Sequence, residues 1–472
     1  MDDAVRLEFG TDGWRDVIAD RFTVANVRRA AHAYAEHLLE RGASTVLVGH
    51  DTRFGGEMFA RAAAETLAEA GLQVAVSASY LPTPALSFAV AHYRAGGGVM
   101  LTASHNPPRY HGFKLKGPYG GTATDDIYRD VARRIPASVP PARAAAVRIE
   151  RFDVRSAYYD ALEGLLDMDA LAGVGGTLVH DPMGGAACGW LSGFVRSRGL
   201  SVAVEEAHAR PDPLFYGVNP EPIAINLAEA MARMARSDAL FAVATDGDGD
   251  RLGAVLPGGA YFNAHQIFAV LLDELVAMGL PGRVVKTFTV SRIIERLAAG
   301  LGRPVVETPV GFKYIVEAML EGDVLIGGEE SGGLGVVGHL PERDGIANAL
   351  LLLQSVARSG QSLDERFRDI ERRTDWRHAY DRLDLELSGN ALKDRVMREL
   401  ADPPATFAGR HVVEVERRDG VKLNLGGDAW LLYRPSGTEP VLRIYCEAPD
   451  AAAVAGLLAA AREWAMSLGE PA

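Results

Sequence analysis

A cluster of three aspartates at every second position has the residue types that bind a metal ion. Asp246, Asp248 and Asp250 are separated by single glycines and directly follow the apolar run Ala239–Val243. An apolar run that ends in a glycine-rich acidic segment is typical of a buried strand leading into a loop. Three carboxylates so close together repel one another, and Mg²⁺ or Ca²⁺ relieves that repulsion because both prefer oxygen ligands. The glycines let the backbone turn all three side chains towards one point, so we expect metal binding here rather than a solvated acidic turn.

The spacing excludes an EF-hand calcium loop. Counted from Asp246, the sixth position is Arg251 and the twelfth is Pro257, where that loop needs a glycine and a glutamate. The remaining metal ligands therefore come from elsewhere in the chain, which favours a catalytic centre. The adjacent Arg251 indicates an anion beside the metal. This arrangement suits phosphoryl transfer, in which a metal and an arginine together neutralise developing charge.

A serine and a lysine ten residues apart form a second candidate site. Ser104 lies in the segment Thr102–Pro108, after the apolar run Val99–Leu101, where glycines before and prolines after favour a tight loop. Ser104 could be a nucleophile or could cap its own turn, and its neighbour His105 need not reach it, so a Ser–His–Asp hydrolase has little support. Lys114 could be an acid or base, which requires a depressed pKa, or an ordinary surface lysine.

Three further loops carry polar or charged side chains of functional interest. Gly328–Gly332 offers carboxylate and hydroxyl oxygens, from Glu329 and Ser331, that suit recognition of sugar hydroxyls. Arg434–Pro440 combines an arginine, two hydroxyls and backbone N–H groups around a glycine, which makes a good phosphate nest. Phe9–Arg15 is a glycine-supported turn that presents an arginine. Each of these segments could also be an ordinary polar loop.

The order of the predicted elements indicates a multidomain α/β protein. Strand-like and helix-like segments alternate until about Arg373, with a linker at Pro136–Val147, and alternating apolar runs then indicate an antiparallel sheet with helices on one face. At 472 residues the chain is too long for one core. We therefore predict three α/β domains and a smaller α+β domain, over residues 1–150, 151–253, 254–370 and 371–472.

The composition is that of an ordinary globular protein and disfavours several partners. Hydrophobic residues make up 48% and charged residues 24% of the chain, and the net charge of −13 disfavours nucleic acid and anionic membranes. The two cysteines, Cys188 and Cys446, have no metal-ligand spacing and argue against a disulfide framework. The N-terminus has no signal-peptide pattern, and no apolar stretch is long enough to span a bilayer. We therefore expect a cytoplasmic protein that is a monomer or a small homo-oligomer.

Taken in order, the candidate loops described above resemble those of the α-D-phosphohexomutase family, which includes phosphoglucomutases and phosphomannomutases. The serine loop, the D-G-D-G-D-R loop, the G-E-x-S-G loop and the R-x-S-G-T loop occur once each, one in every predicted domain. Four motifs in this order are far more specific than any one of them, and the resemblance covers nearly the whole chain. It implies three mixed-sheet α/β/α domains and a C-terminal α+β, TBP-like domain around a central cleft.

The resemblance also implies roles for individual residues. Ser104 is similar to the catalytic serine, which carries a phosphoryl group, and Lys114 is similar to the general acid/base. Supporting active-site groups implied in the same way are Arg15, His105 and Arg251. The implied Mg²⁺ ligands are Asp246, Asp248, Asp250 and an oxygen of phosphorylated Ser104. The residues implied to hold the sugar phosphate are Glu329, Ser331, Lys313, Arg434, Ser436, Gly437 and Thr438.

The implied activity is the interconversion of hexose 1-phosphate and hexose 6-phosphate, with Mg²⁺ as cofactor and a hexose 1,6-bisphosphate as activator. Phosphoserine donates to the hexose phosphate, and the bisphosphate intermediate returns its other phosphate to Ser104. Asp12 stands where many members have serine, and Glu330 and Gly333 stand where dual-specificity members favour Met and His. Glu307–Lys313 is more similar to the glucose branch. We therefore expect a glucose phosphate as substrate, with mannose and glucosamine phosphates as alternatives.

Two other functions are less favoured by the sequence. Water could discharge the phosphoserine, which would make the protein a sugar-phosphate phosphatase, because exclusion of water depends on domain closure. The chain could also be a non-catalytic sugar-phosphate-binding protein. Such a protein would have no need of Ser104, Lys114 and all three aspartates together.

Overall fold

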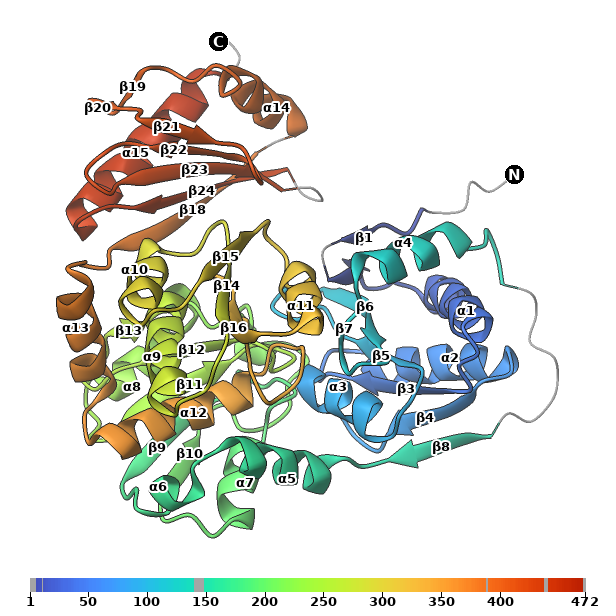
Figure 1. The fold of residues 1–472 in the computed structure, drawn as a ribbon. Coiled ribbons are helices and arrows are strands. Elements are labelled where there is room, and N and C mark those ends of the chain that lie inside the picture. Colours follow the sequence, from blue (N-terminus) through green and yellow to red (C-terminus); the bar gives the residue numbers. More distant parts are fainter. Residues whose placement is uncertain (1–5, 11, 140–147, 388, 437–439, 470–472) are drawn as a thin grey trace. The chain divides into compact units, whose positions relative to one another are not determined.

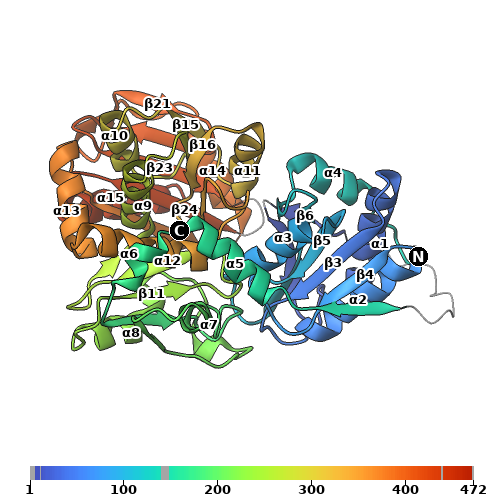
Figure 2. The same ribbon diagram turned by 60° about the horizontal axis from the view of Figure 1, so that its bottom comes forward.

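The chain forms two compact units, which are described separately. The computed structural model describes residues 6–10, 12–139, 148–387, 389–436 and 440–469. The first unit contains Met1–Val285 and Gly311–Phe367, and the second contains Lys286–Val310 and Arg368–Ala472. Figures 1 and 2 show the elements of each unit from two directions.

The first sheet is mixed and organises the N-terminal part of the first unit. Its strand order is β1-β2-β6-β5-β3-β4-β8, with β7 beside β6. Strands β3, β4, β5 and β8 are parallel, whereas β1, β2, β6 and β7 pair antiparallel. The strands are β1 Phe9–Gly10, β2 Gly13–Val17, β3 Thr45–His50, β4 Gln73–Ser77, β5 Gly97–Leu101, β6 Tyr110–Gly117, β7 Gly121–Thr122 and β8 Ile149–Phe152.

Helices cover both faces of this sheet (Figure 1). Val46 and Val48 of β3 share a core with residues of α1, α2 and α4, while Leu47 between them does not, because alternate strand residues point to opposite faces. Helix α3 packs against β3 and β5 and against α5. The four helices of this part are α1 Val24–Glu40, α2 Gly56–Glu69, α3 Thr83–His92 and α4 Asp125–Arg134.

The second sheet carries the acidic loop. Its order is β10-β9-β11-β12-β13, with β9, β10 and β11 parallel and β12 and β13 antiparallel. All five residues of β11 are buried, as the continuous apolar run predicts. The elements are α5 Arg155–Leu165, α6 Met168–Ala172, β9 Thr177–Asp181, α7 Leu191–Ser197, β10 Ala203–Glu206, the 3₁₀ turns η1 Phe215–Gly217 and η2 Ala224–Asn226, α8 Ala228–Met234, β11 Phe241–Thr245, β12 Leu252–Val255 and β13 Tyr261–Phe262.

The third group of elements is divided between the two units. In the first unit, β16 pairs antiparallel with β17, and α9 packs against α12 and β16. The second unit begins inside β14 and includes α10 and β15. The elements are α9 Ala264–Ala277, β14 Arg283–Thr287, α10 Arg292–Gly300, β15 Val305–Thr308, α11 Phe312–Glu321, β16 Val324–Gly328, β17 Leu334–Val336, α12 Gly345–Ser359 and α13 Leu363–Thr374.

The C-terminal elements form an antiparallel sheet, as the alternating sequence predicts. Its order is β18-β24-β23-β22-β21, and a separate pair joins β19 to β20. Alternate residues such as Leu431 and Tyr433 face a core that also contains Leu457 of α15. The elements are β18 Tyr380–Glu386, α14 Asn390–Glu399, β19 Thr406–Phe407, β20 Arg410–His411, β21 Glu414–Glu416, β22 Val421–Asn424, β23 Trp430–Pro435, β24 Val441–Glu447 and α15 Ala451–Ser467.

Three α/β groups followed by an α+β group confirm the predicted fold class. The domain boundaries stay a prediction, and a boundary at residue 150 would cut β8, which joins the first sheet through β4. Most of the predicted linker, residues 140–147, lies outside the described residues. Cys188 and Cys446 are buried free thiols. In the part of the chain that the structure describes, no helix is long and apolar enough to cross a membrane.

Candidate active site

The loop after β11 brings the three aspartates together in the interior of the first unit. β11 and β12 form an antiparallel hairpin, and Asp246, Asp248 and Asp250 are completely buried in the loop between them. One oxygen of each carboxylate lies within 4.8 Å of the other two. Gly249 has a φ of +74°, a left-handed conformation that glycine adopts without strain. The structure therefore contains the acidic cluster at a strand end that the sequence predicts.

Burial and mutual repulsion perturb the ionisation of this cluster. Burial, together with the charges of Asp248 and Asp250, raises the pKa of Asp246 well above its ordinary value. Burial would also raise the pKa of Asp248, but the ammonium group of Lys114, 2.8 Å away, holds that pKa below its ordinary value. The part of this shift that comes from the neighbouring carboxylates is a repulsion that a bound cation would relieve.

The oxygens of the cluster fit a hard divalent cation. The Oδ1 atoms of Asp248 and Asp250 are buried and have no hydrogen-bond partner among the described residues. Their Oδ2 atoms accept hydrogen bonds from Lys114 Nζ at 2.8 and 3.1 Å. Buried oxygens without partners are uncommon in folded proteins, and carboxylate oxygens are the preferred ligands of Mg²⁺. The residues present can therefore hold such an ion.

Ser104 lies beside the cluster with its hydroxyl directed at a carboxylate. Its Oγ donates a hydrogen bond to Asp246 Oδ2 at 2.7 Å, and His105 Nδ1 lies 3.4 Å from the same Oγ. Ser104 is completely buried and has a φ of +53°, a conformation that costs a non-glycine residue about 1–2 kcal/mol. Its N–H donates to Thr102 Oγ1 at 2.9 Å. Because the hydroxyl points at Asp246 instead of capping its own turn, the geometry favours a reactive serine.

The serine loop and the aspartate loop touch at Gly247. A Cβ atom at this position would lie 2.5 Å from the carbonyl oxygen of Ser104. On the other side, a Cβ at Gly185 would lie 2.7 Å from the Gly247 carbonyl oxygen, which accepts a hydrogen bond from Ala186 N at 2.9 Å. Two glycines therefore allow three backbone segments to pack directly on one another and fix the spacing between the loops.

Lys114 lies at the centre of a group of carboxylates. Strand β6 places its buried side chain with Nζ 2.9 Å from Asp12, 2.8 Å from Asp248 and 3.1 Å from Asp250. Burial alone would lower the pKa of Lys114, but the three carboxylates outweigh burial and raise it above its ordinary value. The depressed pKa expected of a general base is therefore not found in this arrangement. The three carboxylates instead hold the ammonium group of Lys114 in place within the cluster.

Arg343 is a second buried cation, and the sequence analysis did not single it out. Its guanidinium lies 2.7 Å from Asp12, 2.8 Å from Asp250 and 3.6 Å from Glu329. The contact with Asp12 joins residues 331 positions apart, and no spacing rule reveals such a contact. The sequence feature that could have indicated Arg343 is the run of three charged residues, 342–344, directly before the apolar helix α12.

Arg15 and Arg251 add positive charge around the cluster. Arg15 donates a hydrogen bond to Asn106 Oδ1 in the serine loop at 2.7 Å. Arg251 Nε lies 4.0 Å from Asp250 Oδ1, and a backbone bridge pairs Arg251 with Gly333. These two arginines, together with Lys114, make the site suitable for an anionic ligand.

The loop after β16 lies against the aspartate loop and carries the predicted sugar-binding groups. Leu252 N donates to the carbonyl oxygen of Gly332 at 3.1 Å, and Glu329 accepts a hydrogen bond from Gly311 N at 3.1 Å. Burial raises the pKa of Glu329 to about 7, although the positive charge of Arg343 acts in the opposite direction. Ser331, in the same loop, is half-buried.

The other predicted substrate-binding residues belong partly to the first unit and partly to the second. In the first unit, Lys313 at the start of α11 pairs with Asp125 at the start of α4. In the second unit, Arg434 Nε donates to Asp419 Oδ2 at 3.0 Å, and the carbonyl oxygen of Ser436 accepts from Lys393 Nζ at 2.8 Å. Gly437 and Thr438 lie outside the described residues. The residues that the structure brings together are Ser104, His105, Arg15, Lys114, Asp246, Asp248, Asp250, Arg251 and Glu329.

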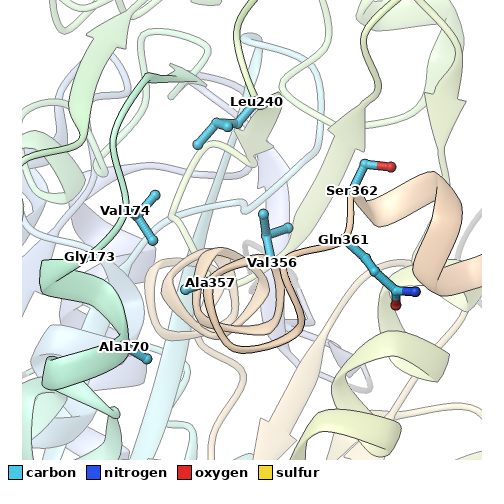
Figure 3. A pocket seen from close by; sticks show the side chains of 9 residues that line it. Ala170, Gly173, Val174, Leu240, Val356, Ala357, Gln361 and Ser362 are labelled. Atoms are coloured by element: carbon cyan, nitrogen blue, oxygen red, sulfur yellow. The ribbon is translucent and has the colours of Figure 1, made fainter.

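A pocket of about 390 Å³ in the first unit is built from other residues (Figure 3). Val174, Leu240 and Val356 form part of its apolar wall, and Gln361 and Ser362 lie at one side. None of its lining residues belongs to the predicted site, so it does not alter the assignment of the site to the acidic cluster.

Comparison with family models relates nearly the whole chain to one family. The models for the phosphoglucomutase/phosphomannomutase α/β/α domains I, II and III match residues 6–139, 156–259 and 263–373. The model for the C-terminal domain of the same family matches residues 394–463. The four matches occur in the same order as the four predicted domains.

Individual relatives agree with these matches. The chain is 30% identical to a phosphoglucomutase/phosphomannomutase of Thermococcus kodakarensis, over 93% of this chain and 94% of that protein. It is 32% identical to a phosphoglucosamine mutase of Salinispora arenicola, with the same coverage of 93% and 94%. A crystal structure of a protein assigned as a phosphomannomutase, from Thermus thermophilus, is 47% identical, has a TM-score of 0.89 and covers 98% of this chain and 99% of its own.

Proposed function

The chain belongs to the phosphoglucomutase/phosphomannomutase family of isomerases, and we propose that it interconverts hexose 1-phosphate and hexose 6-phosphate through a phosphorylated Ser104. One observation carries this proposal. The Ser104 hydroxyl lies 2.7 Å from Asp246 in a buried acidic cluster whose other carboxylates contact Lys114. A serine, oxygen ligands for a hard cation and a buried ammonium group are the parts that phosphoryl transfer requires.

In this proposal Ser104 carries a phosphoryl group between two oxygens of the sugar. The first transfer breaks the bond from phosphorus to Ser104 Oγ and forms a bond to a sugar hydroxyl oxygen, which gives a hexose 1,6-bisphosphate. The second transfer breaks the bond at the other end of the bisphosphate and restores phosphoserine. In the first transfer one proton passes from the sugar hydroxyl to Ser104 Oγ, and in the second transfer it passes back from Ser104 Oγ to the freed sugar oxygen. Lys114 would exchange this proton as general acid/base, since its buried ammonium group lies among the carboxylates of the cluster.

Mg²⁺, when bound, would neutralise charge on the phosphoryl group in transfer. Asp246, Asp248 and Asp250 would hold the ion together with an oxygen of phosphorylated Ser104. The Oδ1 atoms of Asp248 and Asp250, which accept no hydrogen bond from the described residues, support this assignment because they can become ligands while the Oδ2 atoms keep Lys114 in place. Arg15, His105 and Arg251 would bind the phosphoryl oxygens.

We infer that glucose phosphate is the preferred substrate and that glucose 1,6-bisphosphate activates the enzyme. The support comes from the sequence: Glu330 and Gly333 stand where dual-specificity members favour Met and His, and the segment Glu307–Lys313 is more similar to the glucose branch of the family. Mannose and glucosamine phosphates are the alternatives, since relatives named for both are similar over 93% of this chain. Glu329 and Ser331 would hold sugar hydroxyls. The distal phosphate would be held by Lys313, Arg434, Ser436, Gly437 and Thr438.

A ³¹P NMR assay tests the proposal directly. The purified protein is mixed with Mg²⁺, a trace of glucose 1,6-bisphosphate and, in turn, the 1-phosphates of glucose, mannose and glucosamine. The proposal predicts a 6-phosphate signal, fastest with glucose. Release of inorganic phosphate without a 6-phosphate would identify a phosphatase instead. No change with any of the three sugars would contradict the proposed activity.

A further inference from the structure

Arg53 is a buried arginine that contacts the serine loop and has no role in the proposed mechanism so far. It lies three residues after the end of β3, in the loop before α2, and its side chain has no exposed surface. A buried guanidinium needs partners for its charge and its N–H groups, because an unpaired buried charge is costly. Both kinds of partner are present within the first unit.

The four terminal N–H groups of Arg53 match four backbone carbonyl groups, three in the serine loop and one at the first residue of β6. Nη1 donates to the carbonyl oxygens of Pro107 and Tyr110, at 2.9 and 3.0 Å. Nη2 donates to the carbonyl oxygens of Ser104 and Asn106, at 2.7 and 2.6 Å. One side chain thus holds both ends of the segment that begins at the reactive serine.

Asp51 connects the same arginine to the amide of Ser104. Its carboxylate lies 3.2 Å from Arg53 Nε and accepts a hydrogen bond from Arg53 N at 2.9 Å. Its Oδ2 accepts from Thr102 Oγ1 at 2.5 Å, and that hydroxyl oxygen accepts from Ser104 N at 2.9 Å. The carbonyl group of Ser104 is therefore bound directly to Arg53, and the N–H group of Ser104 is bound to Asp51 through Thr102.

The guanidinium also contacts the part of the protein that supports the metal loop. It lies over the ring of Phe215, 4.8 Å from the ring centroid. The edge of the same ring would be 3.4 Å from a Cβ at Gly247, so Phe215 packs directly behind the aspartate loop. Arg53 therefore contacts the serine loop through hydrogen bonds and the support of the aspartate loop through its planar face.

We propose that Arg53 is a positioning residue that holds Ser104 in its left-handed conformation and at the correct distance from the aspartates. This inference rests on the proposed function, in which Ser104 carries the phosphoryl group. Ser104 has a φ of +53°, a region that non-glycine residues occupy only when their surroundings impose it. The bonds from Arg53 to the carbonyl oxygen and, through Asp51 and Thr102, to the amide of Ser104 supply that constraint.

The chemistry of the contact requires arginine rather than any cation. An ammonium group has three N–H donors on one atom and cannot reach four carbonyls on two sides, whereas a guanidinium presents its donors in a rigid plane. The Arg53→Lys variant keeps the charge and most of the volume, and it removes only this geometry. It therefore separates a positioning role from a general need for positive charge.

The test compares Arg53→Lys with a matched control, Arg29→Lys. Arg29 is another buried arginine of the same sheet's helices, whose Nε donates to the Pro136 carbonyl oxygen at 2.7 Å. For each variant we would measure kcat, the affinity for hexose phosphate, the rate at which glucose 1,6-bisphosphate phosphorylates Ser104, and the melting temperature.

We expect Arg53→Lys to lower kcat and the phosphorylation rate about 100-fold, as for a misplacement of about 1 Å. Affinity for hexose phosphate should change less than about threefold, because binding does not depend on the reacting serine. Arg29→Lys should leave both rates close to the unmodified protein.

The outcomes separate this inference from the proposed function. If the unmodified protein shows no mutase activity, the proposed function fails whatever the variants do. If it is active and Arg53→Lys matches Arg29→Lys in both rates, Arg53 does not position Ser104. A parallel loss of substrate affinity and rate would also overturn the inference, since it would indicate general disruption. Should Arg53→Lys fail to fold in the melting experiment, Arg53→Gln, which keeps two planar N–H donors, takes its place with the same expectations.

Discussion

Gly247→Ala tests whether the spacing between the serine loop and the aspartate loop controls the reaction. The added Cβ would lie 2.5 Å from the Ser104 carbonyl oxygen, whereas ordinary contacts begin at 3.4 Å. The loops must therefore separate by about 0.9 Å, because the opposing atom is backbone and not the end of a flexible side chain. Gly247 does not have a positive φ, so the substitution adds bulk without added backbone strain.

The expected effect follows from that displacement. A shift of about 1 Å in reacting groups lowers rates about 100-fold, and we expect a kcat reduced by about 10- to 100-fold. Overpacking at a buried position costs about 1–3 kcal/mol of the free energy of unfolding, which leaves a folded enzyme for assay. A spectrophotometric assay that couples formation of the 6-phosphate to a dehydrogenase measures kcat, and chemical denaturation measures stability.

Gly164→Ala is the matched control, because a Cβ at that helical position would meet no atom within 4 Å. It should keep the kcat of the unmodified protein and gain slight stability from the lower flexibility of the unfolded chain. Our reasoning about loop spacing would be refuted by a Gly247→Ala variant that is folded and turns over at the unmodified rate.

Three other changes give distinct expected results. Ser104→Ala should abolish turnover while the protein stays folded, and mutase activity in this variant would exclude Ser104 as the phosphoryl carrier. Arg343→Met leaves the carboxylates of Asp12 and Asp250 buried without the guanidinium group that pairs with them. The free energy of unfolding should therefore fall by about 3–5 kcal/mol in a denaturation experiment. A loss below about 1 kcal/mol would show that these ion pairs contribute little to stability. Glu329 has its pKa raised from an ordinary 4.5 to about 7, so between these values the folded state holds a proton that the unfolded state has released, and stability falls as pH rises. Relative to Glu329→Gln, the unmodified protein should therefore lose about 3 kcal/mol between about pH 4 and pH 8 in denaturation experiments, and a constant difference across this range would contradict the raised pKa.

The sequence predicts the parts of the site that belong to continuous segments. The run Ala239–Val243 followed by alternating aspartates indicates a buried strand and an acidic loop, and both are confirmed by β11 and the buried carboxylates in the loop after it. The glycines around Ser104 indicate a tight loop, and the structure places its hydroxyl on Asp246. Local patterning carries this information because strand burial and turn formation depend mainly on neighbouring residues.

Contacts between distant segments could not be predicted in this way. Asp12, Arg343 and Lys114 come from three separate parts of the chain, and only the fold brings their charges together. The pKa of Lys114 follows from those contacts: a role as acid or base would require a depressed pKa, and the three carboxylates raise it instead. Arg53 looks like an ordinary charged residue of a loop in the sequence, and its four carbonyl partners become visible only when the serine loop folds over it.

The central claim is that Ser104 gives its phosphoryl group to the sugar, and a single-turnover experiment tests it most directly. Protein phosphorylated with ³²P-labelled glucose 1,6-bisphosphate and freed of excess reagent is mixed with Mg²⁺ and unlabelled glucose 1-phosphate, and the label is followed in the peptide containing Ser104 and in the sugar phosphates. The account predicts that the label leaves this peptide and appears in the sugar phosphates, while unlabelled phosphate from glucose 1-phosphate takes its place on Ser104. Label that stays on Ser104 while unlabelled glucose 6-phosphate accumulates would contradict it.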